Sequence, residues 1–240
     1  MLNNIDLKGM RVAITGGTSG LGLALVRSLA ASGARVAFVA RRAQLVERVS
    51  KETSACGIVG DVGLKEDIHA MALEIAWNLG GLDVLINNAS SLGPMPLKLL
   101  ADTECEELHE ALVVNVLGPF RLTKALFGAL TASAREGRGA AVINISSDAA
   151  VSAYSGWGAY GAAKAALSHM TAVWAEEAKG EGVRFLSLDP GDMDTPLHAL
   201  AVPDADPATL KRPADAARAI VASMLGALRE NAPLALARHP

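Results

Sequence analysis

The sequence predicts one α/β domain built on a doubly wound parallel sheet of about seven strands, with helices on both faces. Short apolar runs alternate with longer helical patterns along the chain, which is typical of βαβ units. The first run, residues 10–15, leads through a glycine-rich turn into a helical segment that reaches about Ser32. Because 240 residues suit one such unit, we expect a single domain over residues 1–240.

Composition excludes several classes of protein. The net charge of −3 leaves no basic surface for nucleic acid. No apolar run reaches the roughly 18 residues of a membrane span, and the first residues lack the apolar core of a signal peptide. Cys56 and Cys105 show no disulfide or metal spacing, and none of the five His has a metal-like partner nearby. We therefore expect a soluble cytoplasmic protein that acts on a small molecule, without a metal, a membrane or a nucleic acid.

The turn at residues 15–22 has glycines in the order Gly-x-x-x-Gly-x-Gly. Such a turn between a strand and a helix is where nucleotide phosphates meet a helix N-terminus. Gly16 would allow a tight turn, Gly20 a close backbone approach, and Gly22 close packing of helix on strand. Further donors would come from three residues of the same turn: Thr18, Ser19 and Leu21. A plain strand–helix connection is the alternative.

The second strand, residues 35–40, ends without an acidic residue. Sites that prefer NAD usually have an acid there, which accepts a hydrogen bond from the ribose 2′-hydroxyl. Here Ala40 is followed by Arg41 and Arg42, which can pair with a 2′-phosphate. This favours NADP(H) as the cofactor. If both arginines are solvated residues of the next helix, NAD(H) or dual use remains.

The next two strands end in polar residues. After a helix at 43–53, a strand at 57–61 ends in Asp61 and Val62, which would border the adenine. A helix at about 64–79 and a strand at 82–86 follow, and the chain then reads Asn-Asn-Ala-Ser at 87–90. Amides at the carboxyl end of a strand either stabilise the rim of the sheet or line a cofactor crevice.

Residues 102–133 predict one long helix that Asp102 caps and that contains Pro119. Asn115 lies on its apolar side, where a buried amide needs hydrogen-bond partners. It either bonds backbone groups or holds a water in a proton relay. A turn at 137–139 leads into a buried strand at 140–145, just before Ser147.

Tyr160 and Lys164 are spaced to lie one turn apart on the same face of a helix at 155–179. A nearby ammonium favours the phenolate, so Lys164 would lower the pKa of Tyr160 towards the range of a general acid/base. Ser147 lies thirteen residues before Tyr160, at the end of a strand, and could reach the same substrate oxygen. A half-buried phenol beside a solvated lysine stem is the alternative.

The C-terminal third predicts a strand at 183–188 and a loop at 189–196. Residues 196–212 are rich in Pro and Asp and predict a mobile lid with one short helix. A last helix at 213–230 and a seventh strand at 234–237 complete the pattern.

Taken together, these residues resemble the classical short-chain dehydrogenase/reductase family over nearly the whole chain. The likeness rests on motifs that agree in identity, order and spacing: residues 15–22, Asn87-Asn88-Ala89, Asn115, Ser147, Tyr160-x-x-x-Lys164, and Pro190-Gly191 with Thr195. The resemblance implies a Rossmann fold and hydride transfer between NAD(P) and a carbonyl or alcohol carbon.

The same resemblance implies a role for each motif residue. Tyr160 would be the general acid/base, and Ser147 would bond the substrate oxygen. Lys164 would hold the nicotinamide ribose, and Asn115 would position a relay water. The remaining cofactor contacts would come from Asn88, Ala89, Ser90, Pro190, Gly191, the backbone of Met193, and Thr195. The family often pairs its two long helices, here 102–133 and 155–179, so we expect a homodimer or homotetramer.

Two positions depart from the family pattern. Ser90 stands where a Gly is common and would narrow the crevice or contact the cofactor. Ser19 stands where NADP-preferring members often carry a basic residue. The expectation of NADP therefore rests on Arg41, Arg42 and the missing acid at position 40.

The function that we expect is that of an NADP-preferring carbonyl reductase or alcohol dehydrogenase. Its substrate pocket would include Ser91, Leu92, Met95, Ala149, Tyr154, Trp157 and Met193. That mostly apolar set suggests a small or medium apolar ketone, although Trp157 and Met95 fit a core or interface equally well. One alternative is a cofactor-binding regulatory or assembly protein with an idle active site. Another is the same fold with dehydration or epimerisation chemistry.

Overall fold

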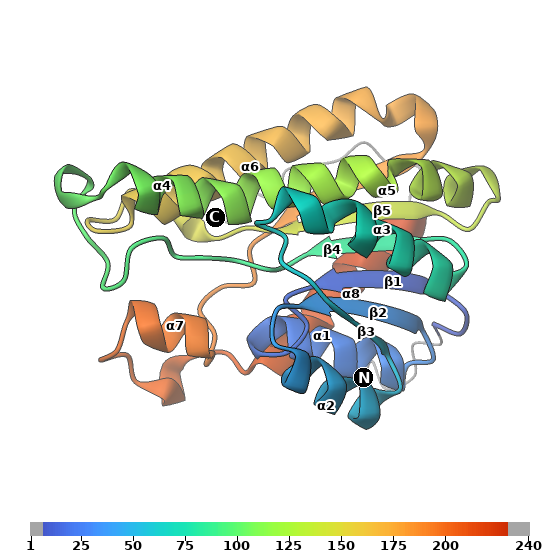
Figure 1. The fold of residues 1–240 in the computed structure, drawn as a ribbon, viewed down its shortest axis with the longest axis horizontal. Coiled ribbons are helices and arrows are strands. Elements are labelled where there is room, and N and C mark those ends of the chain that lie inside the picture. The colour runs from blue at the N-terminus through green and yellow to red at the C-terminus, as the bar shows by residue number, and fades with distance from the viewer. Residues whose placement is uncertain (1–6, 230–240) are drawn as a thin grey trace.

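The computed structural model describes residues 7–229. Within them, six strands form one parallel sheet in the order β3-β2-β1-β4-β5-β6 (Figure 1). The strands are β1 (Arg11–Thr15), β2 (Arg35–Ala40), β3 (Cys56–Val59), β4 (Val84–Asn87), β5 (Ala140–Ile145) and β6 (Val183–Leu188). The seventh strand expected at 234–237 lies outside the described residues.

Helices cover both faces of the sheet (Figure 1), which confirms the doubly wound architecture. One face carries α1 (Gly20–Ala31), α2 (Ala43–Thr53) and α8 (Pro213–Arg229). The other carries α3 (Lys65–Leu79), α5 (Gly118–Arg135) and α6 (Gly158–Glu177). Two shorter helices, α4 (Cys105–Leu112) and α7 (Pro196–Ala201), lie near the carboxyl ends of the strands.

The inner strands β1, β2, β4 and β5 are mostly apolar because most of their residues are buried on both faces of the sheet. In β1, Val12 and Ile14 belong to the core under α1 and α8, whereas Ala13 belongs to the core under α3 and α5. In β2, Phe38 faces the first core and Val39 the second. A strand with two buried faces shows a continuous apolar run rather than an alternation, which is the pattern in the sequence.

The single helix expected over 102–133 is wrong in two respects. Asp102 lies in a short 3-10 turn, and α4 begins after Glu104, whose side chain forms a reciprocal capping box with Glu107. The helix is also interrupted by a π-helical turn, Val113–Leu117, before α5 starts. Pro119 then stands near the start of α5, directly after this π-helical turn.

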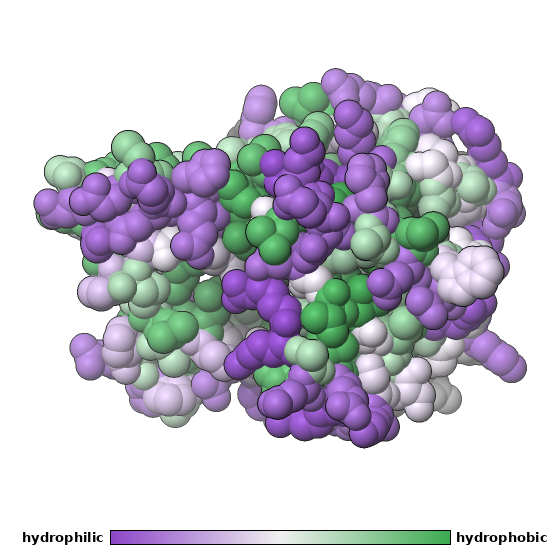
Figure 2. Space-filling model, in the orientation of Figure 1, coloured by the Kyte–Doolittle hydropathy of each residue, from purple (hydrophilic) through white to green (hydrophobic). Residues whose placement is uncertain are grey.

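The combined segment Cys105–Arg135 is long and apolar enough, by length and composition, to cross a membrane. Its position explains the apolar residues differently. Leu122, Leu126 and Leu130 are at most 2% exposed and pack in the core above the sheet. Hydrophilic side chains run along the outward side of α4 (Figure 2). The α5 part of the segment therefore packs one face in the core of the domain.

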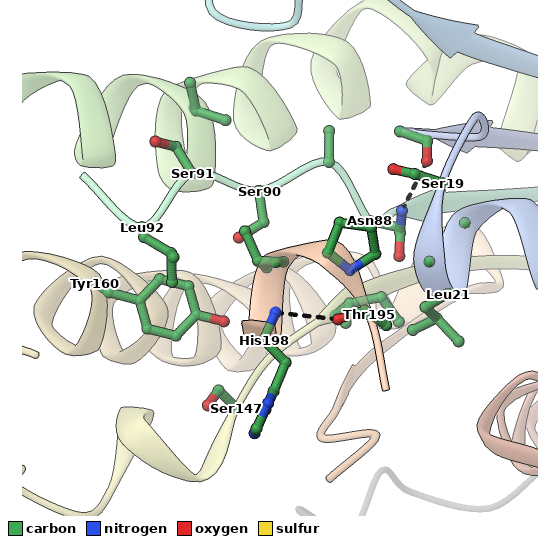
Figure 3. A pocket seen from close by; sticks show the side chains of 18 of the residues that line it. Ser19, Leu21, Asn88, Ser90, Ser91, Leu92, Ser147, Tyr160, Thr195 and His198 are labelled. Atoms are coloured by element: carbon green, nitrogen blue, oxygen red, sulfur yellow. Dashed lines mark hydrogen bonds between the residues drawn. The ribbon is translucent and has the colours of Figure 1, made fainter. Parts of the chain in front are cut away.

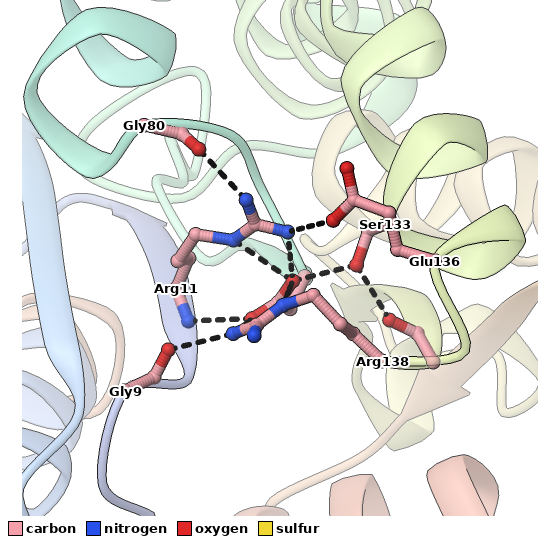
Figure 4. Close-up of polar contacts among 8 residues, drawn as sticks. Gly9, Arg11, Gly80, Ser133, Glu136 and Arg138 are labelled. Carbon is pink, nitrogen blue, oxygen red and sulfur yellow. Dashed lines mark hydrogen bonds and ion pairs between the residues drawn. The ribbon is translucent and has the colours of Figure 1, made fainter.

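A polar cluster ties the sheet together at the amino ends of β1 and β4 (Figure 4). Asp83 is 2% exposed and accepts hydrogen bonds from the main-chain N–H and the guanidinium of Arg11. It also accepts from the Arg138 guanidinium and from the Ser133 hydroxyl, at 2.9 and 2.6 Å. These donors hold the pKa of Asp83 at about 2, although burial acts to raise it.

Candidate active site

A cavity of about 520 Å³ opens at the carboxyl ends of the strands. It extends across the point where the chain order reverses between β1 and β4, the usual ligand crevice of such sheets. All residues expected to contact a cofactor line it: Gly16, Thr18, Ser19, Gly20, Leu21, Gly22, Arg41, Arg42, Asp61, Val62, Asn88, Ala89, Ser90, Tyr160, Lys164, Pro190, Gly191, Met193 and Thr195. The residues expected to contact a cofactor therefore lie together at one edge of the sheet.

The turn between β1 and α1 leaves no room for a side chain at Gly16 or Gly22. A Cβ on Gly22 would lie 2.1 Å from the carbonyl oxygen of Gly16, and Gly16 itself has a φ of +72°. Ser19 precedes α1 and makes no side-chain cap, so its side chain leaves the first N–H groups of the helix to other acceptors. A close backbone and a free helix N-terminus fit a pyrophosphate group.

Asn88 fixes the loop after β4 against the end of β1. Its Nδ2 donates to the carbonyl oxygen of Thr15 at 2.8 Å. The Thr15 hydroxyl accepts in turn from the main-chain N–H groups of Asn88 and Ala89, both at 3.0 Å. Asn88 thus stabilises the rim of the sheet and also lines the cavity, so both roles considered for these amides apply to it.

Arg41 and Asp61 face each other at the far end of the cavity. Arg41 Nη1 lies 3.8 Å from Asp61 Oδ2, and the Arg41 side chain is 73% exposed. Asp61 Oδ1 accepts from the main-chain N–H of Gly63 at 2.8 Å. An exposed ion pair of this kind contributes little stability, so the guanidinium is free to pair with another anion.

Tyr160, Lys164 and Ser147 converge on one part of the cavity. Tyr160 and Lys164 lie on α6 and are 8% and 2% exposed. Ser147 follows β5, and Figure 3 shows its side chain and the Tyr160 phenol at the same cavity as Ser90. Lys164 Nζ donates to the carbonyl oxygen of Ile145 at 2.8 Å, which holds α6 to the end of β5.

Burial dominates the titration of Tyr160. It raises the pKa of the phenol to about 12, and the negative charges of Asp189 and Asp148 act in the same direction. The hydroxyls of Ser90 and Ser147 beside the phenol act to lower the pKa but do not offset burial. The phenol is therefore protonated at neutral pH in this structure.

Burial also lowers the pKa of Lys164 to about 8. Its Nζ lies 5.5 Å from the centroid of the Tyr160 ring and bonds a main-chain carbonyl. The expected lowering of the Tyr160 pKa is therefore not found in this structure, in which burial raises that pKa.

Asn115 lies in the π-helical turn and does not line the cavity. Its Oδ1 accepts from the Ser90 hydroxyl at 2.7 Å and from the Ser91 N–H at 3.3 Å. Its Nδ2 donates to the carbonyl oxygens of Ser91 and Ala111, at 2.7 and 2.9 Å. All four hydrogen-bonding positions of the amide are occupied, so the side chain anchors the loop that carries Ser90 and Ser91.

Apolar side chains lie beside Tyr160 in the cavity. Leu92, Met95 and Trp157 line it, and the Trp157 ring packs edge-on against Tyr160 with centroids 5.8 Å apart. Tyr154 does not line the cavity. Its side chain is 48% exposed, and its hydroxyl donates to Asp148 at 2.7 Å.

Sequence reasoning missed Glu110, Asp148 and Asp192 in the cavity wall, and it gave the lid at about 196–212 without singling out the residues of α7 that line the cavity, Leu197, His198 and Ala201. The three on α7 had a usable signal, because Thr-Pro at 195–196 is an N-cap followed by Pro in the first turn. The Thr195 hydroxyl accepts from the His198 N–H at 3.2 Å (Figure 3).

Comparisons with known proteins agree with this geometry. Residues 10–206 match the family model described as short chain dehydrogenase. The chain is 33% identical to L-fucose dehydrogenase of Mus musculus over 201 residues, which is 83% of this chain and 71% of that protein. A solved 3-ketoacyl-(acyl-carrier-protein) reductase from Brucella melitensis, complexed with NADH, superposes with a TM-score of 0.84 at 27% identity, covering 96% of this chain and 95% of that one.

A short chain dehydrogenase from Burkholderia cenocepacia J2315 in complex with NADP gives a TM-score of 0.79 at 26% identity, over 90% of this chain and 91% of that one. The glycine turn, the Ser147–Tyr160–Lys164 group and the extent of these matches lead to one conclusion. The chain belongs to the short-chain dehydrogenase family.

Proposed function

We propose that the protein is an NADP-preferring carbonyl reductase or alcohol dehydrogenase acting on a small, largely apolar substrate. The observation that carries this proposal is the convergence of Tyr160, Lys164 and Ser147 at the apolar end of a cavity whose other end is a glycine turn. When bound, the nicotinamide cofactor supplies or accepts the hydride.

The residues of the chain supply binding and the proton. Ser147 holds the substrate oxygen by its hydroxyl, and Tyr160 exchanges a proton with that oxygen. Because the phenol is protonated at neutral pH, it is ready to act as the acid that carbonyl reduction requires. Lys164 is held by the Ile145 carbonyl, from which its ammonium is available to a ribose hydroxyl.

The proposed preference for NADP rests on Arg41 and Arg42 at the end of β2. Two relatives of this fold were solved with NADH and with NADP, so the fold accommodates either cofactor. The charge at the cavity wall then favours NADP over NAD. Two guanidinium groups lie there and position 40 carries no acid, and both features favour the extra phosphate of NADP.

A fluorescence titration with NADPH and with NADH tests the cofactor. We expect NADPH to bind about tenfold tighter, or about 1.4 kcal/mol, and Arg41→Ala to lose that difference. Arg135→Ala is the matched control, because its guanidinium is equally exposed and ion-paired but lies on α5. Equal or tighter binding of NADH to the wild-type protein contradicts the proposal.

A screen of carbonyl compounds with Tyr160→Phe as the control tests the chemistry. Removal of the phenolic proton should lower kcat by roughly 100- to 10,000-fold while cofactor binding is kept. Tight cofactor binding without turnover of any carbonyl would instead favour a regulatory protein with an idle site. Product analysis separates reduction from dehydration or epimerisation.

Three further features belong to the same proposal. Residues 196–212, which contribute Leu197 and His198 to the cavity wall, form the lid over the substrate. The faces of α4–α5 and α6 form the contacts of a homodimer or homotetramer. The protein works in the reducing cytoplasm, in keeping with the free thiols of Cys56 and Cys105.

A further inference from the structure

Asp148 follows Ser147 directly, and the two side chains are hydrogen-bonded. Ser147 Oγ donates to Asp148 Oδ1 at 2.9 Å. The Ala149 N–H donates to the same carboxylate oxygen at 2.8 Å and, more weakly, to Ser147 Oγ at 3.2 Å. The other carboxylate oxygen accepts from the Tyr154 hydroxyl at 2.7 Å. Asp148 is thus held on both oxygens, in the wall of the cavity that Ser147 also lines.

This contact decides what Ser147 can offer to a substrate. A serine hydroxyl has one proton to donate and two lone pairs that accept. The proton is directed to Asp148, and one lone pair faces the Ala149 N–H. The group that Ser147 can still offer to a ligand in the cavity is therefore a hydrogen-bond acceptor. An alcohol can donate to that acceptor, whereas a carbonyl oxygen needs a donor.

We propose that Asp148 is a positioning residue that makes Ser147 a hydrogen-bond acceptor, so that the site binds an alcohol more tightly than the corresponding ketone. This inference rests on the proposed role of Ser147 in holding the substrate oxygen. A ketone is held by Ser147 only after the bond to Asp148 breaks, and hydrogen bonds to a carboxylate are among the strong ones.

The protonated phenol completes the arrangement for an alcohol. Tyr160 donates to the alcohol oxygen, the alcohol donates to Ser147, and Ser147 donates to Asp148, so every hydroxyl proton has an acceptor. With a ketone, Tyr160 and Ser147 must both donate to the carbonyl, and Asp148 loses its hydrogen bond from Ser147. The Tyr154 hydroxyl stabilises the alcohol arrangement because it fixes the carboxylate.

The test compares cyclohexanol and cyclohexanone as a probe pair in complexes that cannot react. Dissociation constants are measured by ligand-observed NMR, for the alcohol with NADPH bound and for the ketone with NADP⁺ bound. In the wild-type protein the alcohol should bind more tightly. In Asp148→Ala the ratio of ketone to alcohol dissociation constants should fall about tenfold, or about 1.4 kcal/mol.

Three variants distinguish a positioning role of Asp148 from an effect of negative charge and from a loss of structure. Asp148→Asn keeps an acceptor oxygen for Ser147 and should restore most of the ratio. Tyr154→Phe should lower the ratio partially, and it carries the test if Asp148→Ala does not fold. Asp189→Asn removes a negative charge that also acts on Tyr160 and should leave the ratio unchanged.

An unchanged ratio in Asp148→Ala, tighter ketone binding by the wild-type protein, or no binding of cyclohexanol would overturn the role of Asp148. The proposed function is judged separately, from turnover by the wild-type protein and its loss in Tyr160→Phe. If turnover is normal and the ratio is unchanged, only the proposed role of Asp148 is wrong.

Discussion

Asn87 donates a hydrogen bond from Nδ2 to Asn144 Oδ1 at 2.8 Å, across the neighbouring strands β4 and β5. Both side chains are 3% exposed. Asn144 donates in turn to Thr171 on α6 at 2.8 Å, and Asn87 also donates to Thr123 on α5 at 3.2 Å. The pair therefore joins two strand ends to two helices, immediately before the loops that enter the cavity.

Substitution Asn144→Ala should destabilise the protein by about 1–3 kcal/mol, because it removes one buried hydrogen bond from the Asn87 amide and one from the Thr171 hydroxyl. Urea unfolding monitored by circular dichroism measures the change. Asn78→Ala, an exposed asparagine on α3, is the control and should change stability by less than about 0.5 kcal/mol. Similar losses in both variants would contradict a structural role for the pair.

The carboxylate of Asp83 should make stability depend on acid pH. Its folded pKa of about 2 lies below the ordinary 3.8, so its contribution is present above pH 3.8 and is lost as the pH falls towards 2. The contribution amounts to about 2 kcal/mol. Asp83→Asn should lose this acid-dependent part in unfolding curves between pH 5 and 2, whereas the exposed Asp204→Asn should keep the wild-type slope.

Two glycine substitutions should have opposite effects. Gly22→Ala places a Cβ 2.1 Å from a main-chain oxygen, so it should cost roughly 1–3 kcal/mol and weaken NADPH binding at least tenfold. Gly128→Ala, inside α5 with open space around the new Cβ, should stabilise by up to about 1 kcal/mol and leave cofactor binding intact. Thermal unfolding and NADPH fluorescence measure both effects, and normal binding by Gly22→Ala would count against the phosphate site.

The buried ammonium of Lys164 should lower the stability of the protein at neutral pH. Its folded pKa of about 8 lies below the ordinary 10.5, so between these values the unfolded chain binds more protons and stability rises with pH. The rise from pH 8 to 10 should be about 3 kcal/mol at most, and absent in Lys164→Met. Chemical unfolding at several pH values measures it. The exposed Lys124→Met should behave like the wild-type protein; a flat wild-type curve would contradict a buried ammonium.

The parts that could be predicted from the sequence are those that short segments determine by themselves. Strands buried on both faces produce continuous apolar runs, and the turn at 15–22 needs glycines because a Cβ on Gly22 would clash. The spacing of Tyr160 and Lys164 places them on one helix face whatever surrounds them. These local features were enough to predict that the residues lining the cavity lie together at one edge of the sheet.

The parts that were missed depend on contacts between distant segments. Asp83 sits inside an apolar run, and its partners Arg11 and Arg138 lie 72 and 55 positions away. The pKa of Tyr160 is raised by burial under residues from other elements, which no spacing reveals. Tyr154 is predicted in the substrate pocket, yet it does not line the cavity and its hydroxyl donates to Asp148.

The π-helical turn at Val113–Leu117 has a consequence for length changes in this segment. Such a turn fits one residue more than an α-helical turn into about the same full rotation, so each of its residues advances the helix by less than the roughly 100° of an α-helix. Deleting a residue there other than Asn115 would therefore restore a regular helix and leave α4 and α5 facing their present neighbours. A deletion inside α5 would instead rotate the helix on one side of it by about 100° and move Leu122 or Leu126 out of the core. A one-residue deletion in the π-helical turn should therefore be better tolerated than one inside α5.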